Sequence, residues 1–163
     1  MGYNSIEAEQ ITLQDSSEVM VIRRCDIPSI HSVMVDGVSH NLGILKNFKI
    51  NPTLAQFIPK LATLSLSWVS LQKDEILDTH EHPIESMVIV TSGEVKLVGD
   101  KEDILRSGDL VTIPRGCKHG FIGSGENGFW GLSLQFEQRG LYEKIDIPLV
   151  EFINESKNNI DKY

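Results

Sequence analysis

Residues 80–85 have the sequence His-Glu-His-Pro-Ile-Glu, and residues 108–119 have the sequence Gly-Asp-Leu-Val-Thr-Ile-Pro-Arg-Gly-Cys-Lys-His. The first stretch comes at the end of a strand that we predict over residues 76–82. Side chains two positions apart in a strand point to the same face, so His80 and His82 project together. If that face lines the inside of a barrel, the two imidazoles can bind one metal ion from two directions.

A third histidine stands at the end of the second stretch. His119 follows a predicted turn over residues 114–116 and begins another predicted strand. Imidazole is a good ligand for zinc, copper, iron and nickel, and three protein ligands leave a coordination position open, as in catalytic metal sites. We therefore predict that His80, His82 and His119 bind a metal ion, with a metal-free pocket as the alternative.

The sequence around these histidines predicts an all-β domain. Residues 64–71 alternate apolar and small polar side chains, which is typical of a half-buried strand. Short strands separated by Gly-containing turns then recur roughly every eight to twelve residues, a spacing typical of a sandwich or barrel. They are predicted at residues 76–82, 86–91, 94–98, 103–105, 110–113, 119–122 and 129–136.

The two ends of the chain carry further local patterns. Asp-Gly at residues 36–37, between two apolar runs, predicts a β-hairpin. Asn-Pro at residues 51–52 predicts the cap and first turn of a brief helix. Residues 19–23 are predicted to form a short strand, and apolar residues at helical spacing predict a C-terminal helix from about residue 148 to residue 159.

Composition narrows the class of protein. The 163 residues have a formal net charge of −8 and include two cysteines, which we expect to be free thiols. A negative surface without a cluster of Lys and Arg argues against nucleic acid and membrane partners. We see no secretory signal and no apolar run long enough to span a membrane, so we expect a cytoplasmic protein.

Both quoted stretches resemble the two sequence motifs of the cupin family. Residues 80–85, followed by Gly93, resemble the first motif, which has two His, then Glu or Gln, then Gly. Residues 108–119 resemble the second motif, which runs Gly, five residues, Pro, one residue, Gly, two residues, His. The resemblance implies a double-stranded β-helix, or jelly-roll, barrel that is often a homodimer and holds its metal inside.

On this resemblance we predict one cupin domain over residues 1–163. Its parts are an N-terminal strand extension (1–60), a barrel core (about 61–137) and a C-terminal helical tail (138–163).

The first motif departs from the family pattern at its carboxylate. Counted back from Gly93, the fourth ligand of the family falls on Ser86, and Glu85 comes one residue early. A shift of one residue in a strand turns the side chain to the opposite face. We therefore favour a three-histidine site, with or without water on the Ser86 side. Glu85 is the candidate catalytic acid–base group, with Glu81 as an alternative.

Other side chains are candidates for the wall of the pocket. The predicted lining residues are Ser86, Trp68, Phe121 and Gln135. Arg115 and Lys118 could bind an anionic substrate at the mouth, although a solvated turn is the favoured interpretation of both.

These observations favour a small metal-dependent enzyme that acts on a small organic substrate. A set of imidazoles with open positions fits an oxygen-activating Fe(II) centre, with zinc, manganese or nickel as alternatives. The resemblance weakly favours a dioxygenase. The alternatives are a metal-dependent isomerase or lyase, and a non-catalytic barrel that binds a small ligand.

Overall fold

The computed structural model describes residues 18–58, 63–137, 141 and 150–153. Within these residues the chain forms ten strands and three short helical segments. The helical segments are η1 (Arg24–Asp26), η2 (Phe48–Ile50) and α1 (Pro52–Phe57). The strands are β1 (Ile30–Val35), β2 (Val38–Asn47), β3 (Ser65–Leu71), β4 (Ile76–Glu81), β5 (Ser86–Gly99), β6 (Asp103–Arg106), β7 (Leu110–Ile113), β8 (His119–Gly123), β9 (Phe129–Gln135) and β10 (Glu151–Phe152).

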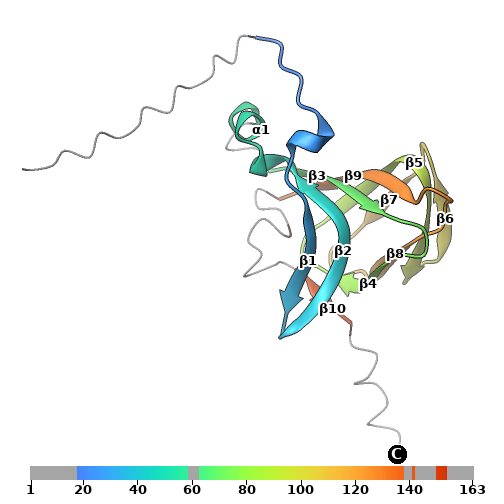
Figure 1. Ribbon diagram of the computed structural model, residues 1–163. Coiled ribbons are helices and arrows are strands. Elements are labelled where there is room, and N and C mark those ends of the chain that lie inside the picture. The colour runs from blue at the N-terminus through green and yellow to red at the C-terminus, as the bar shows by residue number, and fades with distance from the viewer. Residues whose placement is uncertain (1–17, 59–62, 138–140, 142–149, 154–163) are drawn as a thin grey trace, which may run out of the picture.

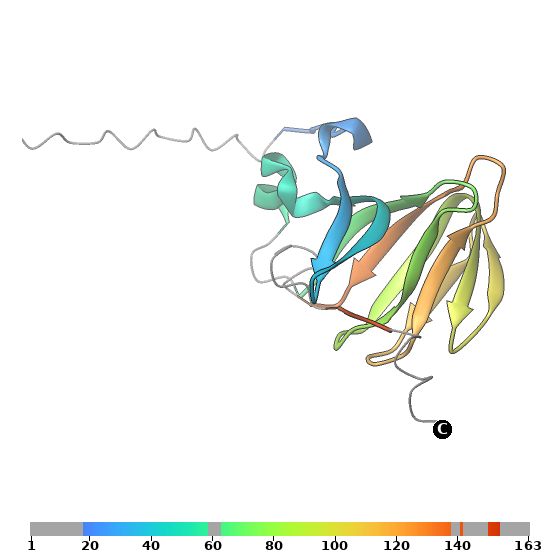
Figure 2. The same ribbon diagram turned by 60° about the horizontal axis from the view of Figure 1, so that its bottom comes forward.

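The strands form a nearly closed antiparallel barrel (Figure 1, Figure 2). They pair in the order β1-β2-β3-β9-β5-β8-β4-β10, and β6 and β7 also pair with β5. The long strand β5 joins the two halves of the barrel, because its first part pairs with β7 and β9 and its second part with β6 and β8. The predicted all-β, jelly-roll fold is confirmed.

The change of partners along β5 occurs at Gly93. Its pairing with Phe129 of β9 is followed at once by the pairing of Glu94 with Arg106 of β6. Gly93 has a φ of +76°, and a Cβ atom there would lie 2.0 Å from the carbonyl oxygen of Gly128. Only glycine combines this left-handed backbone with so close an approach, so the bend that closes the barrel depends on it.

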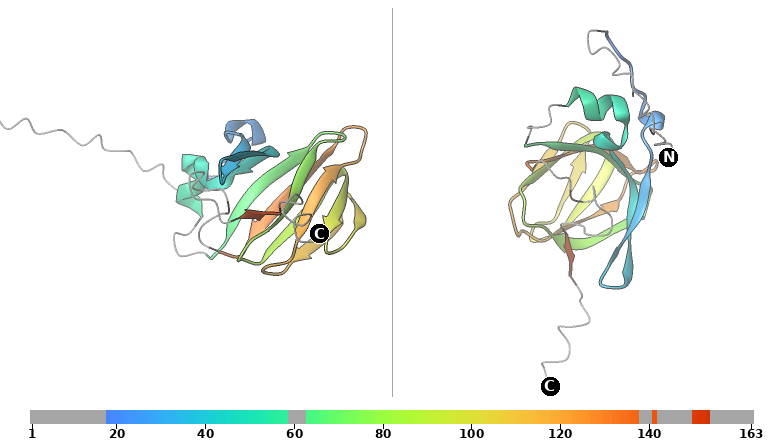
Figure 3. Two further views of the ribbon diagram at one scale, coloured as in Figure 1. Left: turned by 90° about the horizontal axis from the view of Figure 1, so that it is seen from below. Right: turned by 90° about the vertical axis from the view of Figure 1, so that its left-hand side faces the viewer.

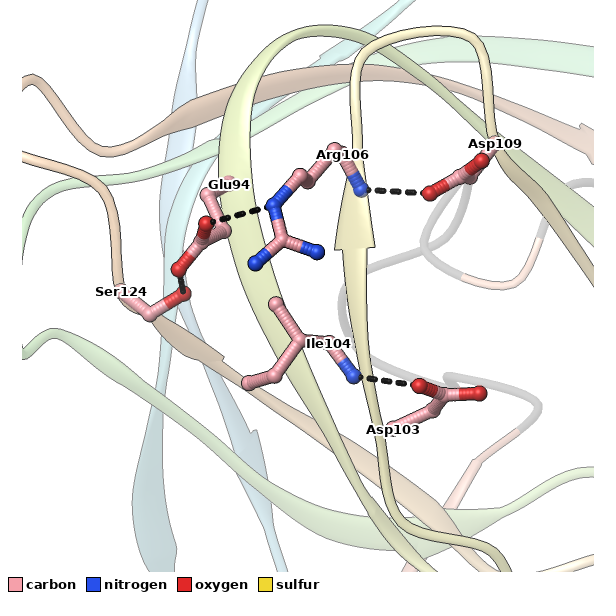
Figure 4. Close-up of polar contacts among 6 residues, drawn as sticks. All are labelled: Glu94, Asp103, Ile104, Arg106, Asp109 and Ser124. Atoms are coloured by element: carbon pink, nitrogen blue, oxygen red, sulfur yellow. Dashed lines mark hydrogen bonds and ion pairs between the residues drawn. The ribbon is translucent and has the colours of Figure 1, made fainter.

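A surface network fastens β6 to its neighbours (Figure 4). The Nε atom of Arg106 lies 3.1 Å from Oε2 of Glu94, and the hydroxyl of Ser124 donates to the other oxygen of Glu94 at 3.0 Å. The backbone N–H of Arg106 donates to Asp109. Exposed ion pairs of this kind contribute at most about 1 kcal/mol, so the network orients the loops more than it stabilises the barrel.

The predicted hairpin and the predicted brief helix are both confirmed. Asp36 and Gly37 join β1 to β2 with φ angles of 51° and 77°, as a type I′ turn requires. The side chain of Asn51 accepts a hydrogen bond from the N–H of Leu54 and caps α1, which begins at Pro52. The hairpin and α1 lie on the same side of the barrel (Figure 3).

Two predicted elements near the chain ends are wrong. Residues 19–23 form no strand, and η1 follows them instead; Val19 and Val21 are 98% and 73% exposed, with no strand to pair with. The predicted C-terminal helix is wrong at Glu151 and Phe152, which form β10 against β4. The free edge of β4 supplies hydrogen-bond partners that local periodicity cannot reveal. The remaining residues of that prediction, apart from 150 and 153, lie outside the described residues.

Two groups of buried apolar side chains fill the interior. One lies within the barrel and includes Val88, Val95, Phe121 and Phe129. The other joins the β1–β2 hairpin to the C-terminal segment and includes Leu42, Leu45, Leu141, Val150 and Phe152. Among the described residues no helix has the length and apolar character needed to cross a lipid bilayer.

Candidate metal centre

The structure brings His80, His82 and His119 together inside the barrel. His80 in β4 is paired directly with His119 at the start of β8, and His82 follows the end of β4. All three side chains are buried. The ring centroids of His80 and His119 are 4.2 Å apart, and those of His82 and His119 are 4.8 Å apart.

Each imidazole is oriented by a hydrogen bond to the backbone. Nδ1 of His80 lies 2.8 Å from the carbonyl oxygen of Asp78, Nδ1 of His82 lies 2.7 Å from that of Ile84, and Nδ1 of His119 lies 3.0 Å from that of Cys117. A carbonyl oxygen only accepts, so each Nδ1 carries the proton and each Nε2 presents a lone pair. Histidines that bind metals are held in this way.

Burial keeps the three imidazoles neutral. Burial, together with the nearby His119 imidazole, lowers the pKa of His80 to about 3. Burial also lowers the pKa of His119 to about 4 and lowers the pKa of His82. All three side chains are therefore neutral at pH 7, which is the form that binds a metal ion.

The donor set fits a transition-metal ion. One nitrogen from each histidine lies within 4.8 Å of the other two, a separation that small side-chain adjustments bring within reach of a single ion. Among the described residues that line the same pocket there is no carboxylate or thiolate, so the protein ligands would be three neutral imidazoles. Such a set could hold zinc, iron, copper or nickel.

The histidines stand at the polar end of a mostly apolar pocket. Polar lining comes from Ser70, Ser86, Ser133 and Gln135 besides the histidines, and the remaining walls are aliphatic or aromatic. The pocket lies where the two apolar groups meet, because it is lined from both: Leu42, Leu45, Leu71, Val88, Ile113, Phe121, Phe129 and Leu141. No Asp, Glu, Lys or Arg among the described residues lines it.

Three of the four predicted wall residues lie in this pocket. Ser86, Phe121 and Gln135 all line it, and the Ser86 hydroxyl lies 3.5 Å from Nε2 of His82. The prediction for Trp68 is wrong. Its neighbour Ser67 is buried, whereas Trp68 points to the other face of β3, where it lies near Phe48 and Arg24. The alternation of side chains along a strand separates the two residues.

Glu85, the predicted acid–base group, also lies outside the pocket. It is exposed, immediately before the buried Ser86, and it does not line the pocket. Its backbone carbonyl accepts a hydrogen bond from Phe136. The one-residue shift therefore turns the Glu85 carboxylate away from the histidines. Glu81, the alternative, does not line the pocket either; it lines a surface hollow that also includes Arg115 and His82.

Some residues next to the site were missed by the sequence analysis. Phe152 of β10 packs against His80, with ring centroids 5.3 Å apart, and stacks on His40 of β2 at 3.8 Å. Leu141 lines the pocket, and its N–H donates to Oε1 of Gln135 at 2.9 Å. No local pattern marks Phe152 or Leu141, because each reaches the site from a segment distant in sequence from the motifs.

Residues 67–129 match the family model of the cupin domain. The chain therefore contains a cupin domain. This cupin is similar in fold to the polyketide cyclase RemF from Streptomyces resistomycificus, with 18% identity over 72% of this chain and 79% of that chain and a TM-score of 0.54. An oxalate oxidase structure shares 18% identity over 67% of this chain and 54% of that chain, with a TM-score of 0.50.

Other similar structures are longer than this cupin. The DMSP lyase DddQ from Ruegeria pomeroyi shares 23% identity over 46% of this chain, with a TM-score of 0.43, and the match spans 39% of that chain. A match to oxalate oxidase in complex with glycolate spans 46% of that chain. At 18% identity the likeness to RemF and to the first oxalate oxidase structure is one of fold alone. A comparison with curated protein sequences finds no match.

Proposed function

We propose that this cupin is a metal-dependent enzyme in which His80, His82 and His119 bind a divalent ion, with Fe(II) as the first candidate, next to a small organic substrate. The observation that carries the proposal is the shared tautomer of the three buried imidazoles. Each Nδ1–H is bonded to a carbonyl, which leaves three Nε2 lone pairs in one cavity. When bound, the ion would supply Lewis acidity or, as iron, oxygen activation.

The chain itself would orient the substrate and exclude water. The apolar walls around Val88 and Phe121 form a low-dielectric cavity, and the Ser86 hydroxyl next to His82 offers a hydrogen bond beside the metal ligands. Within the described part of the chain no Asp or Glu lines the pocket, and its three histidines would be occupied as metal ligands, so no side chain there remains to act as general base. This absence favours an oxidoreductase over an isomerase or lyase that relies on such a base.

Elemental analysis of protein purified without a His tag tests the proposal. We expect about one divalent metal ion per chain. We also expect a loss of metal affinity of more than about 100-fold in His80→Ala, His82→Ala and His119→Ala, because losing a ligand costs more than losing a group that hydrogen-bonds to a ligand, which costs about 10–100-fold. His31→Ala is the matched control. His31 lies outside the pocket in β1, with Nδ1 3.0 Å from the carbonyl oxygen of Gly43, so this variant should retain the metal.

The outcomes separate the candidate functions. Full metal content in a His80→Ala/His119→Ala double variant would contradict the proposed site. Dioxygen consumption by the iron-loaded protein with a small organic substrate would support a dioxygenase. Stabilisation by such a compound without turnover would indicate the non-catalytic ligand-binding barrel instead. The single-domain boundaries, the homodimer and the cytoplasmic location stay predictions.

A further inference from the structure

The charge of the proposed metal site restricts what can bind beside it. The three histidine ligands are neutral, and Ser86 occupies the position next to them where a carboxylate would bring a negative charge. A divalent ion held by this set would keep its whole positive charge inside an apolar barrel. A buried charge is costly unless it is paired, so a ligand that brings one negative oxygen to the ion is favoured over a neutral one.

Beyond the histidines, the described residues that line the pocket offer no partner for a second charge. Arg115 lines a surface hollow that also includes His82, and Lys118 lines another that also includes His119, but neither cation lines the pocket itself. Lys46 follows the pocket residue Leu45 in β2, but its Nζ atom donates to the carbonyl oxygen of Ile27 at 2.7 Å. Among the described residues, the part of a ligand that extends away from the metal into the pocket would therefore meet apolar walls and uncharged polar groups.

The pocket also limits the size of the ligand. About 60 Å³ is open to the centre of a water-sized molecule, and one water needs about 10–15 Å³ on this scale, so the space is equivalent to roughly four to six waters. Leu141 forms part of the wall, where Gln135 Oε1 accepts its N–H. Truncation of Leu141 would enlarge the cavity without changing a metal ligand.

We propose that the site selects a small monoanionic oxygen ligand with a short apolar body: the negative oxygen binds at the metal, the body fills the apolar pocket, and Leu141, as part of the wall, limits the size of that body. The inference rests on the proposed metal binding by His80, His82 and His119. It assigns to Leu141 the role of a specificity-determining residue and disfavours a ligand whose second charge would lie in the apolar pocket away from the metal.

The test uses the full chain loaded with Co(II), whose visible absorption reports ligands that bind at the metal. Butyrate and succinate have the same number of carbons and differ by one carboxylate. At neutral pH we expect succinate to bind at least about tenfold more weakly than butyrate, because its second carboxylate has no cation in the pocket. Cobalt content measured after removal of each carboxylate controls for simple extraction of the ion.

Chain length supplies the second part of the test. In Leu141→Ala, the affinity for hexanoate relative to that for butyrate should rise by about fourfold for each methylene that the enlarged cavity accepts. Leu110→Ala is the matched control, since Leu110 is an exposed residue of β7 outside the pocket, and it should leave the ratio unchanged. Thermal melts establish that both variants are folded.

The outcomes distinguish the two proposals. Cobalt binding with succinate as tight as butyrate, or with an unchanged hexanoate-to-butyrate ratio in folded Leu141→Ala, would overturn the ligand class while leaving the metal site intact. Failure of the wild-type protein to bind cobalt would overturn the proposed function and the ligand class with it. The butyrate–succinate comparison needs only the wild-type protein, so it remains decisive even if a variant fails to fold.

Discussion

Ser86 and Glu85 are adjacent in the chain and face opposite sides of the barrel wall. The Ser86 hydroxyl lies 3.5 Å from Nε2 of His82, whereas the Glu85 side chain is exposed to solvent. This alternation leaves the proposed metal with three neutral protein ligands instead of three imidazoles and a carboxylate. The chemistry of the site is therefore set by which of two neighbouring residues points inward.

Glu85→Gln tests this assignment at the scale of one residue. Since the side chain lies outside the pocket, we expect the substitution to change metal affinity by less than about twofold and stability by less than about 0.5 kcal/mol. Metal titration and chemical denaturation measure the two quantities. A loss of metal comparable to that in His82→Ala would mean that the carboxylate reaches the ion after all.

At the scale of elements, β5 depends on a bend that only glycine allows. We expect Gly93→Ala to cost more than about 4 kcal/mol, because its Cβ would lie 2.0 Å from a backbone oxygen in addition to the left-handed strain. Gly116→Ala is the matched control, with a φ of +75° and no atom within 4 Å of the added Cβ. It should cost only the strain, about 1–2 kcal/mol. If urea denaturation shows that Gly93→Ala and Gly116→Ala lose the same free energy of unfolding, the backbone at Gly93 tolerates a side chain.

The short strand β10 supports the site from outside the motifs. Phe152 is 9% exposed and packs on His40 and His80, and the N–H of Ile153 donates to the carbonyl of Thr79. Phe152→Ala should cost about 3–5 kcal/mol and weaken metal binding by about tenfold, because the His80 ring loses a neighbour that orients it.

Phe57→Ala controls for the loss of an aromatic ring. Phe57 is 73% exposed in α1, so its removal should change stability by less than about 0.5 kcal/mol. Phe152→Ala with unaltered stability and metal affinity would mean that β10 is not part of the support of His80.

For the whole molecule, the buried histidines make the stability of the metal-free protein depend on pH. The folded-state pKa values of His80 and His119, about 3 and 4, lie below the unfolded value of 6.5. Between these values the unfolded chain binds more protons than the folded chain, so protonation favours unfolding. The contribution of these two histidines to the free energy of unfolding is fully present above pH 6.5. It falls as the pH drops toward 4, by up to about 1.4 kcal/mol per pH unit for each histidine.

Denaturation of the metal-free protein at a series of pH values measures this slope. A His80→Leu/His119→Leu variant removes both groups and should show a much flatter profile between pH 6.5 and 4. A wild-type protein with the same profile as this variant would contradict the assignment of neutral, buried imidazoles.

The sequence by itself determined the strand-rich barrel, the hairpin at residues 36–37 and the three histidines as a group. Each of these features depends on residues that are close together in the sequence. Alternating side chains indicate the strands, residues that tolerate a left-handed backbone indicate the turn, and the spacing within two motifs indicates the histidines. His80 and His82 share a face because they are two positions apart, and His119 was found through its motif.

Only the tertiary structure decided which side chains complete the pocket. Leu42 and Leu141 line the pocket from outside the motifs, and Phe152 packs on the ring of His80. The places of all three depend on pairing and packing between distant segments. Local periodicity suggested a helix where Phe152 lies, because apolar spacing alone contains no information about the unpaired edge of β4. Trp68 was predicted to line the pocket for a similar reason. Alternation shows that a strand has two faces, and only the closed barrel shows which face points inward.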